Sequence, residues 1–144
     1  MIEDKVLNRS VILLEELHNR TREGKLGWLD AGYANAHGPS VPLGNSISHL
    51  GFKTKSGGYI LRIQMLPDEN FPNEPDFALH IINPDTDEII ETISNATLGP
   101  ALDHRTADGL TPYVLLKQTY EMARRQSRGI EDILEHVLES LRQQ

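Results

Sequence analysis

The chain has 144 residues, no cysteine and a formal net charge of -7. A chain of this length buries roughly 68–70% of its unfolded surface, so we expect residues 1–144 to fold as a single domain. The lack of cysteine excludes disulfides, thiolate zinc sites and cysteine nucleophiles.

The N-terminal segment predicts neither a signal peptide nor a membrane span. Its longest apolar run extends only from Val11 to Leu14. A signal-peptide core needs about 7–15 apolar residues and a spanning helix about 20. We therefore expect a cytoplasmic protein with no membrane partner.

The negative charge is concentrated in the middle of the chain. Residues 30–110 carry eleven acids and four bases, whereas acids and bases balance in the segments before and after them. A phosphate backbone is repelled by a surface of this sign. We therefore expect no nucleic-acid partner.

The first half of the chain predicts one helix followed by strands. Apolar residues recur every three or four positions over 3–23, which is typical of an amphipathic helix that Gly24 would end. The glycine-rich segment 25–46 is expected to be mostly loop. A strand follows over 46–54, with Gly51 as a bulge, and the turn at 56–58 would close a hairpin.

Two further stretches alternate apolar and polar residues, as half-buried strands do. They span 58–66 and 76–83, and a return strand spans 88–94. We expect 67–75, 83–88 and 95–109 to connect these elements. One buried face of the sheet is expected to hold six side chains: Tyr59, Leu61, Ile63, Phe77, Leu79 and Ile81.

The last third of the chain predicts two helices. Thr111 is suited to cap the first helix, Pro112 to open it, and Gly129 to separate it from the second. The second helix has an amphipathic pattern whose apolar residues are Ile130, Ile133, Leu134, Val137, Leu138 and Leu141. The fold class is therefore α+β: an N-terminal helix, a four-stranded antiparallel meander, and two C-terminal helices that cover it.

Three arginines lie close together at the predicted helix–helix corner: Arg124, Arg125 and Arg128. Cations are stabilised at a helix C-terminus, so these residues have a structural explanation. The alternative is a docking point for an acidic surface, including the acidic middle segment of another copy.

Four segments carry a resemblance: LLEELHNRTREGKLGWLDA, YILRI, FALHIINPDTDEIIETI and LLKQTYEMARRQSRGIEDILEHVLESL. Together they resemble a recurring small bacterial domain of unknown function. The resemblance implies a helix, a short β-meander and two C-terminal helices, occurring alone or beside effector and signalling domains of bacterial conflict systems. Its motifs are helix corners and a hairpin turn, so it transfers no catalytic residue.

Histidines and acidic residues offer two weak metal hypotheses. His49 and His80 would bind zinc with His37 if they faced each other on neighbouring strands; the alternative is that they are packing or surface residues. The run 85–88 resembles the start of a calcium loop, but it lacks the later glycine and glutamate and is better explained as a hairpin turn. We assign no metal ligand and no cofactor.

The segment 98–109 offers the one group of residues suited to acid–base chemistry: Asp103, His104, Arg105 and Asp108. No phosphate-binding loop and no nucleophile motif accompanies it. The alternative is a solvated loop, so we assign no catalytic residue.

The sequence therefore favours a non-enzymatic interaction module, an accessory or adaptor protein that binds another protein through its acidic sheet edge and loops or through a helix face. We expect a homodimer or a different partner docked on the helix over 130–141, with six interaction residues: Arg124, Arg125, Arg128, Ile130, Val137 and Leu141. The alternative is a small hydrolase-like or ligand-binding protein with a site under the 30–46 and 98–109 loops.

Overall fold

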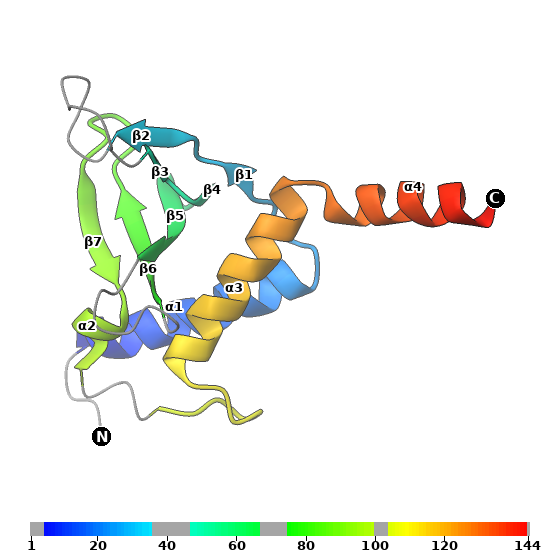
Figure 1. Ribbon diagram of the computed structural model, residues 1–144. Helices are drawn as coiled ribbons and strands as arrows, with labels where there is room; N and C mark the ends of the chain where they lie inside the picture. Colours follow the sequence, from blue (N-terminus) through cyan, green and yellow to red (C-terminus); the bar gives the residue numbers. More distant parts are fainter. Residues whose placement is uncertain (1–4, 36–46, 67–74, 100–103, 144) are drawn as a thin grey trace.

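The computed structural model describes residues 5–35, 47–66, 75–99 and 104–143, which form an α+β fold (Figure 1). The helices are α1 (Lys5–Arg22), α2 (Asn95–Leu98), α3 (Pro112–Ser127) and α4 (Ile130–Arg142). The strands are β1 (Leu29–Asp30), β2 (Tyr33–Asn35), β3 (Ile47–His49), β4 (Phe52–Ser56), β5 (Tyr59–Leu66), β6 (Asp76–Ile82) and β7 (Ile89–Ile93). The predicted 67–75 connection lies almost entirely outside the described residues.

The main sheet is antiparallel and has five strands in the order β1-β4-β5-β6-β7, while β2 and β3 form a separate two-stranded sheet. The antiparallel α+β architecture confirms the fold class, but the count of four strands was wrong. The additional strand, β1, has only two residues and lies in the segment expected to be loop. Two residues are too few to show an alternating pattern.

Gly51 divides the strand predicted over 46–54 into β3 and β4. Its φ is +87°, and a Cβ atom at this position would lie 2.0 Å from the carbonyl oxygen of Ile63. The backbone therefore passes too close to β5 for any side chain to fit. Gly51 consequently marks a strand break, where a bulge was expected.

The turn between β4 and β5 is confirmed as a two-residue hairpin. Ser56 pairs with Tyr59, and the intervening Gly57 and Gly58 have φ values of +61° and +82°. Positive φ at both central positions matches the right-handed twist of the flanking strands.

The core lies between the sheet and the helices α1 and α3 (Figure 1). Four of the six predicted face residues are buried, and Ile81 is partly buried, whereas Tyr59 is 47% exposed. The expected burial of Tyr59 was wrong, because this residue begins β5 beside the turn, where the helices do not cover the sheet. The four buried residues are Leu61, Ile63, Phe77 and Leu79.

The helix α3 begins as the sequence predicts. The Val114 N–H donates to the Thr111 hydroxyl at 3.2 Å, and Pro112 occupies the first turn. Its aromatic face packs on the sheet, where the Tyr120 ring lies 5.4 Å from Phe52 and 5.2 Å from Phe77. The preceding segment, expected to be loop, also contains α2, a four-residue helix.

The helix α4 does not cover the sheet, so that expectation was wrong. Gly129 adopts a left-handed conformation with φ +60°, as expected of a helix breaker, and α4 then projects away from the body (Figure 1). Its apolar face is exposed. An amphipathic pattern shows that a helix needs an apolar neighbour, but it does not identify that neighbour.

Candidate functional site

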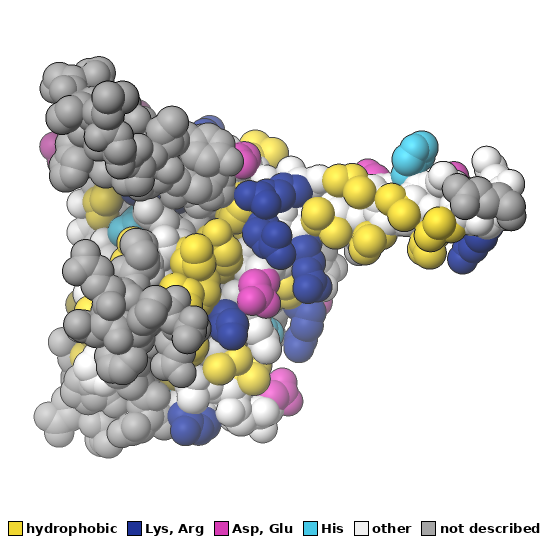
Figure 2. Space-filling view, in the orientation of Figure 1, with side chains coloured by type: hydrophobic (Ala, Val, Ile, Leu, Met, Phe, Trp, Pro, Cys, Tyr) yellow, Lys and Arg dark blue, Asp and Glu magenta, His cyan; other side chains and the backbone are white. Residues whose placement is uncertain are grey.

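The apolar face of α4 is the largest group of exposed apolar side chains on one described helix. Its side chains are between 44% and 59% exposed in five cases: Ile133, Leu134, Val137, Leu138 and Leu141. Figure 2 shows these hydrophobic atoms running along the projecting helix. Contiguous apolar patches on soluble proteins usually mark contact surfaces.

The helix α4 is also short for a helix that stands alone. It has 13 residues. Isolated helices shorter than about 12–15 residues are marginal in water, because nucleation is costly and few hydrogen bonds repay it. A second element packed on the apolar face would supply the missing stabilisation.

The three predicted arginines lie at the base of α4, around the end of α3. Arg124 and Arg125 are in the last turn of α3, and the Arg128 N–H donates to the Arg124 carbonyl at 3.1 Å. Figure 2 shows a band of Lys and Arg side chains at this junction. None of the three arginines forms an ion pair with a side chain that the structure describes.

A groove of about 950 Å³ connects the arginines to the apolar face of α4. We call it the basal groove. It is lined by the end of α1, the segment after it, the end of α3 and the start of α4, through Thr21, Arg22, Gly24, Leu26, Gly27, Met122, Arg124, Arg125, Gln126, Gly129, Ile130, Asp132 and Leu134. Its α4 wall is apolar through Ile130 and Leu134 and acidic at Asp132, and its α3 wall is basic at Arg124 and Arg125. The sequence did not predict it, because its walls are about 100 residues apart.

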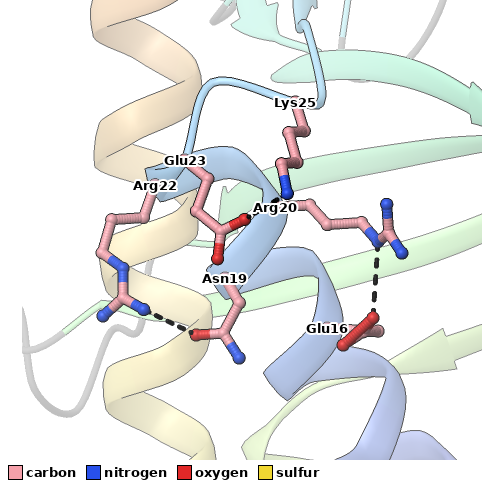
Figure 3. A network of polar contacts seen from close by, with 6 residues as sticks. All are labelled: Glu16, Asn19, Arg20, Arg22, Glu23 and Lys25. Atoms are coloured by element: carbon pink, nitrogen blue, oxygen red, sulfur yellow. Dashed lines mark hydrogen bonds and ion pairs between the residues drawn. The ribbon is translucent and has the colours of Figure 1, made fainter.

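The end of α1 contributes further cations (Figure 3). Arg20 pairs with Glu16 at 3.4 Å and Lys25 with Glu23 at 3.1 Å, whereas the Arg22 guanidinium donates to the neutral Asn19 amide at 3.2 Å. The hydrogen bond and charge of Lys25 lower the pKa of Glu23. Of these three cations, Arg22 is the one that lines the basal groove.

Hydrogen bonds from Trp28 and Gln126 fix one wall of the basal groove. The Trp28 indole donates to the Thr21 hydroxyl at 2.9 Å, and the Trp28 backbone N–H donates to the Gln126 side chain at 3.2 Å. The Gln126 amide donates in turn to the Thr21 carbonyl at 3.4 Å. These bonds join the end of α1 to the end of α3, and they hold the groove in shape.

Tyr120 lies beside the same arginines. Burial against the sheet raises the pKa of its phenol, and the positive charges of Arg128 and Arg124 partly offset that rise. Arg124 therefore lies near enough to Tyr120 to affect its phenol, and it also lines the basal groove together with Arg125.

The predicted acid–base residues do not converge on one site. The His104 ring lies 2.8 Å from the Glu15 carboxylate, and Arg105 donates to the His104 carbonyl at 3.3 Å. Asp108 lines a separate hollow of about 350 Å³ with His18, whose ring is 2.6 Å from the Gln118 amide oxygen. Asp103, like residues 36–46 of the other predicted loop, lies outside the described residues.

The predicted zinc arrangement is not formed as expected. His80 lies in β6, between β5 and β7, whereas His49 lies in β3 and pairs with β2, so the two are not on neighbouring strands. The His80 ring contacts Thr92 at 2.9 Å and Gln64 at 3.3 Å. No metal-binding group of His, Asp or Glu occurs among the residues described, and His37 lies outside them.

The His80 side chain belongs to a polar row across the sheet face opposite α1 and α3. Arg62 and Thr92 are its cross-strand neighbours in β5 and β7. Burial, and then the charge of Arg62, lower the pKa of His80. Burial also lowers the pKa of Arg62, whose Nε is buried without a hydrogen-bond partner in the described structure.

The segment 85–88 forms a turn, as the sequence favoured. The Asp87 N–H donates to the Asn83 carbonyl at 2.8 Å, and Asp87 itself has φ +61°. The Asp85 N–H donates to the Asn83 side chain at 2.9 Å. These local bonds account for the polar residues of the turn.

In comparisons with known proteins, no family model, curated protein or solved structure matched this chain. Within the described residues, no helix is both long and apolar enough to cross a membrane.

Proposed function

We propose that this protein is a non-enzymatic interaction module that binds another protein chain through the apolar face of α4. The observation that carries the proposal is the projection of α4 from the body, with five large apolar side chains about half exposed. Burying apolar surface stabilises an interface by about 25 cal/mol per Å² before the costs of association. The basal groove and its arginines extend the same surface.

The catalytic alternative has less support. The acid–base residues of the 104–108 segment point to different neighbours, and neither described hollow holds an activated nucleophile beside a base. The resemblance to small bacterial domains found beside effector and signalling domains agrees with an accessory or adaptor role. We include that setting in the proposal.

Two adjacent substitutions on α4 test the proposal. Val137→Glu places a charge on the apolar face, while His136→Glu makes the same charge change on the polar face. Each variant is compared with the wild-type chain for self-association and for complexes captured from cells by cross-linking and identified by mass spectrometry. We expect Val137→Glu to abolish a specific complex that His136→Glu retains. Equal complexes for all three proteins would contradict the proposal.

A further inference from the structure

We propose that the occupant of the α4 face is a second copy of this chain, whose α4 runs antiparallel to the first with its C-terminal end at the basal groove. This inference rests on the proposed function and names its partner. A second copy brings an equally unpartnered apolar helix, so one contact would cover both faces. A two-fold contact also closes the assembly at two chains.

The spacing of the apolar residues on α4 suits an antiparallel pair. Ile130, Leu134, Val137 and Leu141 are separated by four, three and four residues, so the spacing is the same in both directions. In a reversed second helix, Leu141 therefore lies opposite Ile130, and Val137 lies opposite Leu134. All four positions are then paired, with knobs-into-holes packing along the seam.

The charges favour the antiparallel orientation over the parallel one. A helix carries partial negative charge at its C-terminal end. Antiparallel pairing places that end of each α4 beside Arg124 and Arg125 of the other copy, which have no described ion-pair partner. Parallel pairing would instead bring the arginines of the two copies together. The last turn of α4 carries one acid, Glu139, and one base, Arg142, so the side chains there balance and the attraction comes from the helix end itself.

Analytical ultracentrifugation of the full chain measures the association. We expect a monomer–dimer equilibrium whose dissociation constant rises at least about a hundredfold for Val137→Glu, because a carboxylate would be buried in the seam. His136→Glu is expected to leave the constant within about threefold of wild type. A wild-type chain that stays monomeric at several hundred micromolar would overturn the inference.

The arginines are tested with a matched pair of double variants. Arg124→Gln with Arg125→Gln removes two charges at the basal groove, and Lys53→Gln with Lys55→Gln removes two exposed charges from β4. We expect the arginine variant to weaken the dimer about tenfold at low salt, with a smaller difference at high salt. Equal behaviour of the two variants would overturn the assigned role of the arginines.

The absence of native cysteine permits an orientation test by disulfide trapping. Single variants Ile130→Cys and Leu141→Cys, one carrying an affinity tag, are mixed and oxidised under mild conditions. The two positions are 11 residues apart, about 16 Å along one helix. In the antiparallel pair, a thiol at either position is therefore too far from the same position in the second chain to form a disulfide with it. We expect the mixed product to dominate. Homodimeric products of each variant alone would indicate a parallel pair and overturn the orientation.

The outcomes separate this inference from the proposed function. A monomeric chain that still loses a captured heterologous partner in Val137→Glu, but not in His136→Glu, overturns the second copy and leaves the interaction module standing. A chain for which neither self-association nor capture depends on Val137 overturns both.

Discussion

At the scale of single residues, Gly51 shows how one position decides strand pairing. The chain leaves the β2–β3 sheet and enters the five-stranded sheet here, and the Gly51 backbone is in contact with β5. A sequence pattern detects the glycine but not the neighbour that requires it. The close approach to Ile63 explains why a strand break forms where a bulge was expected.

Replacing Gly51 with alanine should therefore be severely destabilising. The new Cβ would overlap the Ile63 carbonyl oxygen, and the residue would keep a φ of +87°. We expect Gly51→Ala to lower the free energy of unfolding by about 3 kcal/mol or more, measured by urea denaturation. Gly58→Ala is the control, because its φ is +82° with nothing within 4 Å, and it should cost only about 1–2 kcal/mol. Equal losses would show that the steric contact is absent.

His80 should make the fold less stable in acid. Its pKa is lowered in the folded protein by burial and by the charge of Arg62, so the unfolded chain binds a proton at higher pH than the folded one. The contribution of neutral His80 to the free energy of unfolding is present above the unfolded pKa of about 6.5, and it is lost as the pH falls below that value. We expect stability to fall between pH 7.5 and 5.5 by on the order of 1 kcal/mol or less from this group.

The measurement is the slope of unfolding free energy against pH. His80→Gln should flatten the slope relative to wild type, and His136→Gln, on the exposed helix α4, controls for the general loss of a histidine. An unchanged slope in His80→Gln would refute the assignment.

At the scale of elements, the body and α4 differ in what holds them in place. The strands β5 and β6 and the helices α1 and α3 share one core, whereas α4 begins after Gly129 and exposes its apolar side. Stability of the body should therefore depend little on α4 when the chain is dilute and dissociated from any partner.

A pair of leucine-to-alanine substitutions tests this division. Leu61 is 5% exposed in the core and Leu134 is 56% exposed on α4. We expect Leu61→Ala to cost about 2–5 kcal/mol of unfolding free energy, from lost burial and the cavity left behind. Leu134→Ala should cost less than about 0.5 kcal/mol in the dilute monomer. Comparable losses in chemical denaturation would mean that α4 packs on its own body.

Elements with a long periodic pattern were the ones that the sequence predicted well. The helix α1, the strands β5 and β6, and the capped start of α3 each extend over enough residues for burial to leave a clear alternation. The two-residue β1 and the four-residue α2 are too short for that. The exposed α4 face and the basal groove depend on a backbone turn at Gly129 and on contacts between distant segments, which no local pattern contains.

At the scale of the whole molecule, the net charge opposes nucleic-acid binding despite the arginine cluster. Residues 30–110 carry eleven acids against four bases and so account for the whole imbalance of -7. We expect no measurable DNA or RNA binding at near-physiological ionic strength. Fluorescence titration with a labelled duplex and a labelled single strand checks this. Micromolar affinity with a steep salt dependence would instead make Arg124, Arg125 and Arg128 a phosphate-binding site.

The overall shape of the dimer follows from the projection of α4. Antiparallel pairing of two arms, each about 20 Å long for 13 residues, places the two bodies at opposite ends of the helix pair. Two chains of this length in one compact globule would have a radius of gyration of about 19 Å. Small-angle X-ray scattering of the dimer should therefore give a clearly larger radius and a distance distribution with a second maximum, from the separated bodies. Dilution below the dissociation constant should remove that maximum, and Val137→Glu should lack it at concentrations where the wild-type chain is dimeric. A dimer with a radius near the compact value would mean that α4 folds back onto a body, and that a different surface joins the chains.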